Sequence, residues 1–157
     1  MHAHSFPSSE HRATKPFEKI HPDLKQFPTV SYHKYRYFMS FFDEALSYGW
    51  TVCLKQKSDA KQAMRNFIAM VRNQFDTTIK KWHIDNGGEF QGLGMEEFLE
   101  ENGILVEKGA PYAHQQNGHA ERFNRTIMDK AESMRFTACL PNLFWGFVIL
   151  HAAWVYN

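Results

Sequence analysis

The sequence predicts a single α/β domain, and three observations lead to that class. The length of 157 residues suits one domain, and hydrophobic residues make up 43% of the chain, which is enough for a core at this size. Short apolar runs with strand character are interspersed with longer segments whose apolar residues recur every three or four positions. The predicted order is three strands, a helix, a strand, a helix, a strand and two helices.

The first three strands are expected to follow a polar leader. Residues 1–16 lack apolar periodicity and predict a flexible leader, so the domain itself is expected over residues 17–157. A turn at residues 47–49 would join the second and third strands as an antiparallel hairpin. The three strands are expected at residues 17–24, 35–42, which is dense in aromatic residues, and 50–55.

A helix is predicted next, with Ser58 or Asp59 as its cap because a short side-chain oxygen can accept from the free N–H groups of the first turn. Asn102 and Gly103 are expected to end a later, shorter helix in the left-handed conformation. In chain order, the expected elements are a helix from about 60 to 75, a strand at 79–85, a helix at 95–101, a strand at 104–106, a polar loop at 109–118, a helix from about 120 to 134 and a helix at 144–155.

The overall composition excludes some classes and leaves others open. No apolar run reaches the length of about 18 residues that a membrane span needs, so no membrane partner is expected. Two distant cysteines, Cys53 and Cys139, form neither a disulfide framework nor a zinc motif, and indicate a reducing compartment. The net charge of +1 does not by itself indicate nucleic-acid binding, which usually depends on Lys and Arg contacts with phosphates.

Three acidic residues occupy positions that are unusual for acids. Asp23 lies in or at the end of an apolar strand, Asp85 ends another strand before two glycines, and Glu121 adjoins the apolar face of a helix. Carboxylates are seldom buried without a partner, and Mg²⁺ is a partner that prefers oxygen ligands. Two such ions can stabilise both oxygens of an in-line displacement at phosphorus. The pattern therefore indicates a carboxylate metal site, although each acid alone is equally typical of a surface charge or a loop cap.

Two longer segments connect these acids to a known family. Residues 83–90 (HIDNGGEF) resemble the DNGGEF segment of copia-type retrotransposon integrases, and residues 110–122 (APYAHQQNGHAER) resemble their APYTPQQNGVAER segment. Residues 20–24 resemble the segment with the family's first Asp, and residues 140–145 resemble its LPxxFW segment. Asp85 and Glu121 are separated by 35 residues, which is the spacing of the integrase superfamily.

The resemblance implies a fold and a set of roles. The fold would be RNase H-like, with a five-stranded mixed sheet of three antiparallel strands followed by two parallel strands, flanked by helices. Asp23, Asp85 and Glu121 would be catalytic residues and would bind two Mg²⁺ or Mn²⁺ ions. The reactions would be the family's 3′-end processing and strand transfer. Asn117 and Gly118 would shape the loop beside the site, and the residues placed to contact DNA would be Gln115, Gln116, Asn117, Asn124 and Arg125.

The resemblance also implies partners and a context. DNA, as element ends and target, would be the substrate, and the active complex would be a homo-oligomer. The zinc domain that precedes the catalytic core in this family and the family's C-terminal region are not in the sequence, so it is expected to be a part of a polyprotein. Such a protein would be intracellular, in the nucleus or in a cytoplasmic particle.

Departures from the family pattern leave alternatives open. Pro22 stands where the family has a small or β-branched residue, and proline is disfavoured inside a central strand. Residues 25–28 (KQFP) replace the usual Gly-Pro after the first Asp. Asp43, which also follows an apolar strand, is the alternative to Asp23, unless it is a structural carboxylate bonded to backbone. The alternative functions are an RNase H-like nuclease and a catalytically silent nucleic-acid-binding remnant of an integrase.

Overall fold

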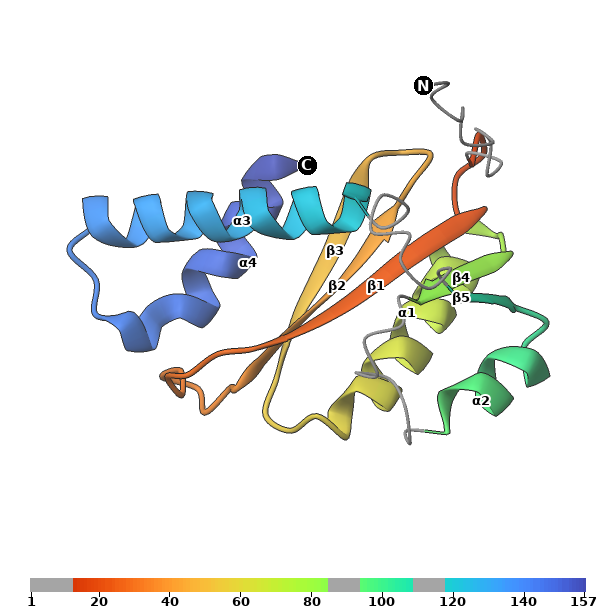
Figure 1. Ribbon diagram of the computed structural model, residues 1–157, viewed down its shortest axis with the longest axis horizontal. Helices are drawn as coiled ribbons and strands as arrows, with labels where there is room; N and C mark the ends of the chain where they lie inside the picture. Colours follow the sequence, from red (N-terminus) through yellow and green to blue (C-terminus); the bar gives the residue numbers. More distant parts are fainter. Residues whose placement is uncertain (1–12, 85–93, 109–117) are drawn as a thin grey trace, which may run out of the picture.

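The computed structural model describes residues 13–84, 94–108 and 118–157. Five strands and four α-helices lie in these ranges, and a short 3₁₀ helix, η1, precedes the last of them (Figure 1). The strands are β1 (Lys19–Gln26), β2 (Tyr37–Asp43), β3 (Tyr48–Leu54), β4 (Lys81–Ile84) and β5 (Leu105–Lys108). The helices are α1 (Asp59–Phe75), α2 (Met95–Glu101), α3 (Gly118–Thr137), η1 (Asn142–Phe144) and α4 (Trp145–Tyr156).

The strands form one five-stranded sheet in the order β3-β2-β1-β4-β5. Strands β1, β2 and β3 are antiparallel, whereas β4 pairs in parallel with both β1 and β5. This is the mixed sheet of three antiparallel and two parallel strands that was expected. Strand β1 is central, so a residue on it can meet side chains from both halves of the sheet.

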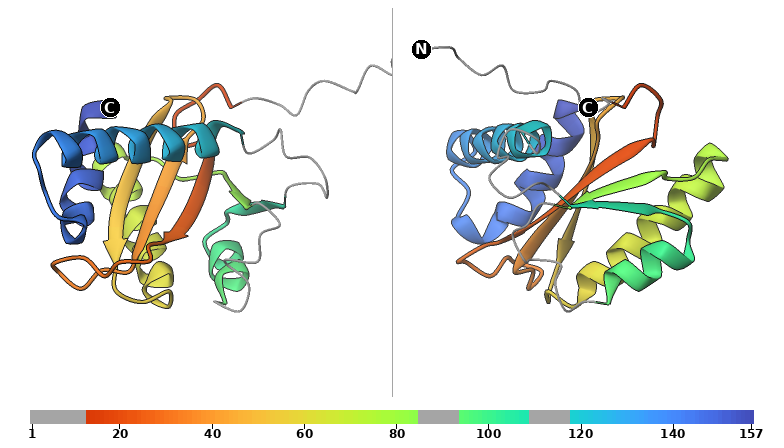
Figure 2. Two further views of the ribbon diagram at one scale, coloured as in Figure 1. Left: turned by 60° about the vertical axis from the view of Figure 1, so that its left-hand side comes forward. Right: turned by 45° about the vertical axis from the view of Figure 1, so that its right-hand side comes forward.

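The helices cover the two faces of the sheet separately. In Figure 2, α1 and α2 lie on one side of the sheet and α3 and α4 on the other. The alternation of side chains along a strand assigns each residue to a face. On β2, Met39 and Phe41 join the core with α1, while Phe38 and Phe42 join the core with α3 and α4.

The core under α1 is built from large aromatic side chains. Phe41 stacks on Phe67 of α1, with ring centroids 4.3 Å apart and planes 3° apart. Trp82 of β4 is fully buried and meets both rings edge-on. Helix α1 therefore presents the apolar face that its sequence spacing predicted, with Ala60, Met64, Phe67, Ile68 and Val71 buried.

Two local expectations near this core were wrong. Helix α1 begins at Asp59, but no side chain caps its free N–H groups: the Ser58 hydroxyl pairs with Gln56, and the Asp59 carboxylate accepts from the Gln56 N–H. The turn between β2 and β3 also differs from the prediction, because it spans residues 44–47 instead of 47–49. The Asp43 carboxylate accepts hydrogen bonds from the N–H groups of residues 45 and 46, which closes the turn early and leaves Tyr48 and Gly49 in β3.

The second helical layer lies close to the sheet. A Cβ atom on Gly49 would fall 2.1 Å from the Phe123 ring of α3, so only glycine allows this approach of the helix to β3. Helix α4 then packs beside α3 and against β3.

Gly103 has φ +69° and ends α2 in the left-handed conformation, as expected. Among the described helices, none combines the length and the apolar character that a membrane span requires.

A candidate carboxylate site between β1 and α3

Asp23 lies on the face of β1 that α3 covers. Ile20 and Leu24 of β1 belong to the core under α1. Asp23 is an odd number of positions away from both, so it lies on the opposite face of the sheet. Its side chain is 20% exposed, and the Lys25 ammonium lies 3.7 Å from its Oδ2 atom. A half-buried carboxylate on a central strand thus faces a helix instead of the solvent.

Asn124 of α3 holds this carboxylate. Its side chain is fully buried, and its Nδ2 atom donates a hydrogen bond to Oδ2 of Asp23. The Oδ1 atom of Asn124 is also buried and has no hydrogen-bond partner among the described residues. Such an atom is unusual in a folded protein, because a buried amide oxygen without a partner is destabilising by about 1–3 kcal/mol.

Glu121 lies one turn before Asn124 on the same helix. Residues three apart on a helix are neighbours, so Glu121 is placed near the helix edge that contacts β1. Its side chain is exposed and lines a hollow of about 340 Å³ together with Lys25 and Arg125. The structure therefore brings Asp23 and Glu121 to the same face of the sheet, and we call this pair, with Asn124, the carboxylate site.

The other predicted site residues have different outcomes. Asp85 directly follows β4 in the sequence but lies outside the described residues, as do Gln115, Gln116 and Asn117. Arg125 is exposed and lines the hollow beside Glu121. Asn124 is buried against Asp23, a role that the sequence did not predict, and its contact with DNA stays a prediction, as does that of Arg125.

The alternative residue, Asp43, has the environment of a structural carboxylate. It is fully buried, and its two oxygens accept hydrogen bonds from the backbone N–H groups of Phe17, Ala45 and Leu46 at 2.6–2.9 Å. Burial raises the pKa of Asp43, although these backbone hydrogen bonds oppose the rise. Asp43 is also an even number of positions from Met39 and Phe41 on β2. It therefore shares their face of the sheet and lies on the opposite face from Asp23.

Pro22 is accommodated in β1 itself, next to Asp23. It is buried and faces Phe41 in the register with β2. The described pairing of β1 with β4 covers only Lys19 and Ile20. Pro22 therefore lies beyond that paired stretch, where the missing N–H removes no described hydrogen bond to β4.

A buried charged cluster, which sequence reasoning missed, continues the polar face of β1. Lys19 is 4% exposed, and its ammonium lies 3.0 Å from a Glu107 oxygen, while Lys81 contacts the other oxygen at 2.8 Å. His21 is fully buried and bonds to Glu44 at 2.9 Å. We call Lys19, His21, Glu44, Lys81, His83 and Glu107 the charged cluster.

The charged cluster shifts the titration of two members. Burial of Glu107 opposes ionisation, but the hydrogen bonds and charges of Lys81 and Lys19 outweigh it and lower the pKa of Glu107 to about 2. Burial lowers the pKa of His83 to about 4, and the neighbouring His21 and Lys19 charges contribute. The sequence signal was the alternation of polar residues Lys19 and His21 with apolar ones before Asp23.

The carboxylate site suits a divalent cation in its chemistry. Asp23 and Glu121 offer only oxygen donors, which Mg²⁺ prefers. The unpaired Oδ1 atom of Asn124 adds a third polar oxygen that is buried beside them. No group of three or more His, Cys, Asp or Glu side chains arranged to hold a metal occurs within residues 13–84, 94–108 and 118–157. A complete ligand set would therefore need a residue outside these ranges, where Asp85 lies.

A five-stranded mixed sheet in this order, with helices on both faces, is the architecture of an RNase H-like domain. Residues 13–114 match the family described as integrase core domain, and the chain belongs to that family. The fold is also that of a chain in the intasome of simian T-cell lymphotropic virus bound to the PP2A regulatory subunit B56 gamma, with a TM-score of 0.75. That likeness covers 99% of this chain and 54% of the other, at 17% sequence identity.

The particular relatives are retrotransposon polyproteins. The chain is 34% identical, over its full length, to the retrovirus-related Pol polyprotein from transposon TNT 1-94 of Nicotiana tabacum, covering 12% of that protein. It is 32% identical to the Pol polyprotein from transposon RE1 of Arabidopsis thaliana, over 97% of this chain and 10% of the relative. A transposon Ty1 Gag-Pol polyprotein of Saccharomyces cerevisiae is 28% identical over 83% of the chain and 8% of its own length. The chain thus spans about a tenth of the length of these relatives.

Proposed function

We propose that this domain cuts and joins DNA by divalent-metal-dependent phosphoryl transfer, as the catalytic core of a retrotransposon integrase. The two steps would be trimming of the element's 3′ ends by water and attack of the new 3′-hydroxyl on target DNA. The observation that carries the proposal is the hydrogen bond from Asn124 to Asp23, one helical turn from Glu121. This contact connects the central strand to α3, and in this proposal the phosphodiester would react beside it.

Each residue of the carboxylate site has a distinct task in this proposal. Asp23 and Glu121, with Asp85, would hold the metal ions. Bound metal ions would supply charge stabilisation for the attacking and leaving oxygens. Asn124 would fix the orientation of the Asp23 carboxylate, because a ligand held by a hydrogen bond keeps its geometry. Lys25 and Arg125, which border the hollow beside Glu121, would attract the DNA phosphates.

The partners in this proposal are DNA and further copies of the chain. The structural relative is part of an intasome, which supports an assembly of the same kind here. Gln115, Gln116 and Asn117 would approach the DNA from the segment before α3, and we place the protein in the nucleus or in a cytoplasmic particle. These proposals concern the domain as part of a longer protein, because its relatives are about ten times its length.

A strand-transfer assay tests the proposal directly. Pre-cleaved duplexes with the element's own terminal sequence would be incubated with plasmid DNA and Mg²⁺, and joined products would be counted by sequencing. We expect joining by the wild type, a loss of at least about 100-fold in Glu121→Gln, and no change in Glu100→Gln, an exposed control on α2. The variant keeps the shape of the side chain and removes only its charge.

The same assay separates the alternatives. Cleavage of the duplex with no joined product would favour the nuclease. DNA binding without metal-dependent cleavage or joining would favour the silent remnant. Joining that persists unchanged in Glu121→Gln would contradict the proposed role of the carboxylate site.

A further inference from the structure

Two hollows lie beside α3 and share two lining residues. The first, of about 340 Å³, contains Glu121 and Lys25 of the proposed active site. The second, of about 220 Å³, opens between α3 and the start of α4. Met128 and Asp129 line both hollows, so the two are neighbours along α3.

The second hollow has a firm apolar wall. Phe27, just beyond β1, stacks on Trp145 with ring centroids 4.1 Å apart and planes 8° apart. Trp145 is 3% exposed, and its indole N–H donates to the Thr29 carbonyl at 2.8 Å. Ala131 and Ile149 complete the floor. These side chains are held by packing and hydrogen bonding, so the cavity exists before any ligand arrives.

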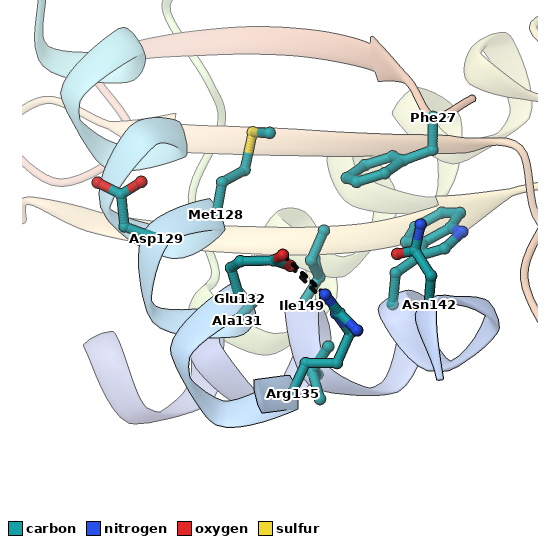
Figure 3. A pocket seen from close by; sticks show the side chains of 10 residues that line it. Phe27, Met128, Asp129, Ala131, Glu132, Arg135, Asn142 and Ile149 are labelled. Carbon is teal, nitrogen blue, oxygen red and sulfur yellow. Dashed lines mark hydrogen bonds and ion pairs between the residues drawn. The ribbon is translucent and has the colours of Figure 1, made fainter. Parts of the chain in front are cut away.

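The rim of the hollow is polar, with one carboxylate neutralised (Figure 3). Arg135 bonds to both oxygens of Glu132, at 2.8 and 3.1 Å, and also donates to the Leu140 carbonyl at 3.0 Å. Asp129 and Asn142 lie on opposite sides of the cavity in Figure 3. Arg135 therefore offsets the charge of Glu132 but not that of Asp129. The Asp129 carboxylate remains as a charged hydrogen-bond acceptor on the rim of the hollow.

We propose that the second hollow binds one unpaired, amino-bearing base of the DNA strand that reacts at the carboxylate site. This inference rests on the proposed function. A cavity of about 220 Å³ is smaller than the roughly 300–1,000 Å³ of sites for drug-sized ligands and suits a single ring system. A carboxylate accepts from an exocyclic amino group, which cytosine and adenine carry and thymine lacks.

Two cations at the first hollow and the distance between the hollows along α3 agree with a DNA strand as the occupant. Lys25 and Arg125 border the first hollow, where backbone phosphates would pass. Glu121 and Glu132 are 11 positions apart on α3, which corresponds to about 16 Å along the helix axis. At the stacked spacing of about 3.4 Å, roughly five nucleotides cover this distance. An eight-nucleotide strand is therefore long enough to occupy both hollows.

Fluorescence anisotropy with labelled dC8 and dT8 at one fixed salt concentration tests the inference. The two strands have the same backbone and ring size, and differ at the base edge that Asp129 would contact. We expect dC8 to bind the wild type about tenfold more tightly than dT8. The preference should fall to within about twofold in Asp129→Ala and persist in Glu100→Ala, because both residues are exposed but only Asp129 borders the hollow.

A second variant fills the cavity. Ala131→Met should also abolish the preference for dC8, and its melting temperature shows whether it is folded; if it does not fold, Asp129→Ala alone decides. Equal binding of dC8 and dT8 by the wild type, or an unchanged preference in Asp129→Ala, would overturn the base-binding inference. Strand transfer measured in parallel keeps the two proposals separate. Joining without base preference defeats only this inference, and base preference without joining defeats only the proposed function.

Discussion

The two faces of the sheet are built from the same strands but have different contents. Toward α1 and α2, the central strands present mainly apolar residues, among them Leu24, Phe41 and Trp82, and the buried carboxylate of Asp43 is bonded to backbone N–H groups. Toward α3 and α4, β2 presents Ser40 between Phe38 and Phe42, and β1 presents Lys19, His21 and Asp23 at alternate positions. The first face has the composition of a protein core, whereas the second mixes a core with buried charge.

The polar groups of the second face are incompletely satisfied. Among the described residues, buried polar atoms without a hydrogen-bond partner include Oδ1 of Asn124 and the Ser40 hydroxyl, while Nδ1 of His83 lies 3.7 Å from a Glu107 oxygen. The face toward α1 contributes the Trp82 indole nitrogen. Native proteins contain few such atoms because each is destabilising. The α1 face thus has the composition of an apolar core, whereas the α3 face combines a second apolar core with the carboxylate site and the charged cluster.

The largest expected effect is on the stability of the α1 face. Phe41→Ala removes a fully packed ring from between Phe67 and Trp82, and should lower the free energy of unfolding by about 3–5 kcal/mol. Phe136→Ala, at a residue that is 65% exposed, should change it by less than about 1 kcal/mol. Urea denaturation measures both. Equal losses in the two variants would contradict the assignment of the core.

A substitution on the opposite face should affect function more than stability. Asn124→Ala removes the hydrogen bond to Asp23 but also a buried, unpaired oxygen, so the free energy of unfolding should change by only about 1 kcal/mol. Strand transfer should fall about 10- to 100-fold, and more Mg²⁺ should be needed for half-maximal activity. Mg²⁺ titrations of the joining rate, with urea denaturation alongside, provide both values. An unchanged Mg²⁺ requirement together with a large loss of stability would make Asn124 a structural residue only.

The charged cluster predicts a smaller, pH-dependent effect. Since Lys81 and Lys19 hold the pKa of Glu107 near 2, below its ordinary value of 4.5, ionised Glu107 stabilises the fold above about pH 4.5. This contribution should disappear as the pH falls from about 4.5 to about 2. Glu107→Gln should therefore lose less stability than the wild type over that interval, as followed by circular dichroism. The exposed Glu96→Gln variant serves as the control, and parallel curves for wild type and Glu107→Gln would argue against the cluster.

The smallest expected effect is a difference in thiol reactivity between the two cysteines, which needs no substitution and measures whether α4 stays packed on β3. Burial between β3 and α4 raises the pKa of the Cys53 thiol to about 12, whereas Cys139 is exposed. Cys139 alone should react with a thiol reagent at pH 8 in the folded protein, and both should react in denaturant. Mass spectrometry of the labelled peptides identifies the site. Rapid labelling of Cys53 without denaturant would show that α4 does not stay packed on β3.

Local sequence patterns predicted the elements better than they predicted the site. The spacing of apolar residues located α1 and α3, because one buried face of a helix depends on neighbours in sequence. The charged cluster escaped prediction because Lys19 is paired with Glu107, which is distant in sequence and meets it only after β4 and β5 have joined the sheet. For the same reason, nothing in the sequence indicated that Asn124 would be buried against Asp23.

The central claim is that Asp23 and Glu121 share a divalent cation, and a crystal structure with Mn²⁺ tests it most directly. The anomalous signal of Mn²⁺ locates the ion independently of the protein atoms. We expect a peak within coordination distance of carboxylate oxygens of both Asp23 and Glu121, with Asp85 completing the ligand set. A saturated crystal without a peak between Asp23 and Glu121, or with one on either residue alone, would contradict the claim.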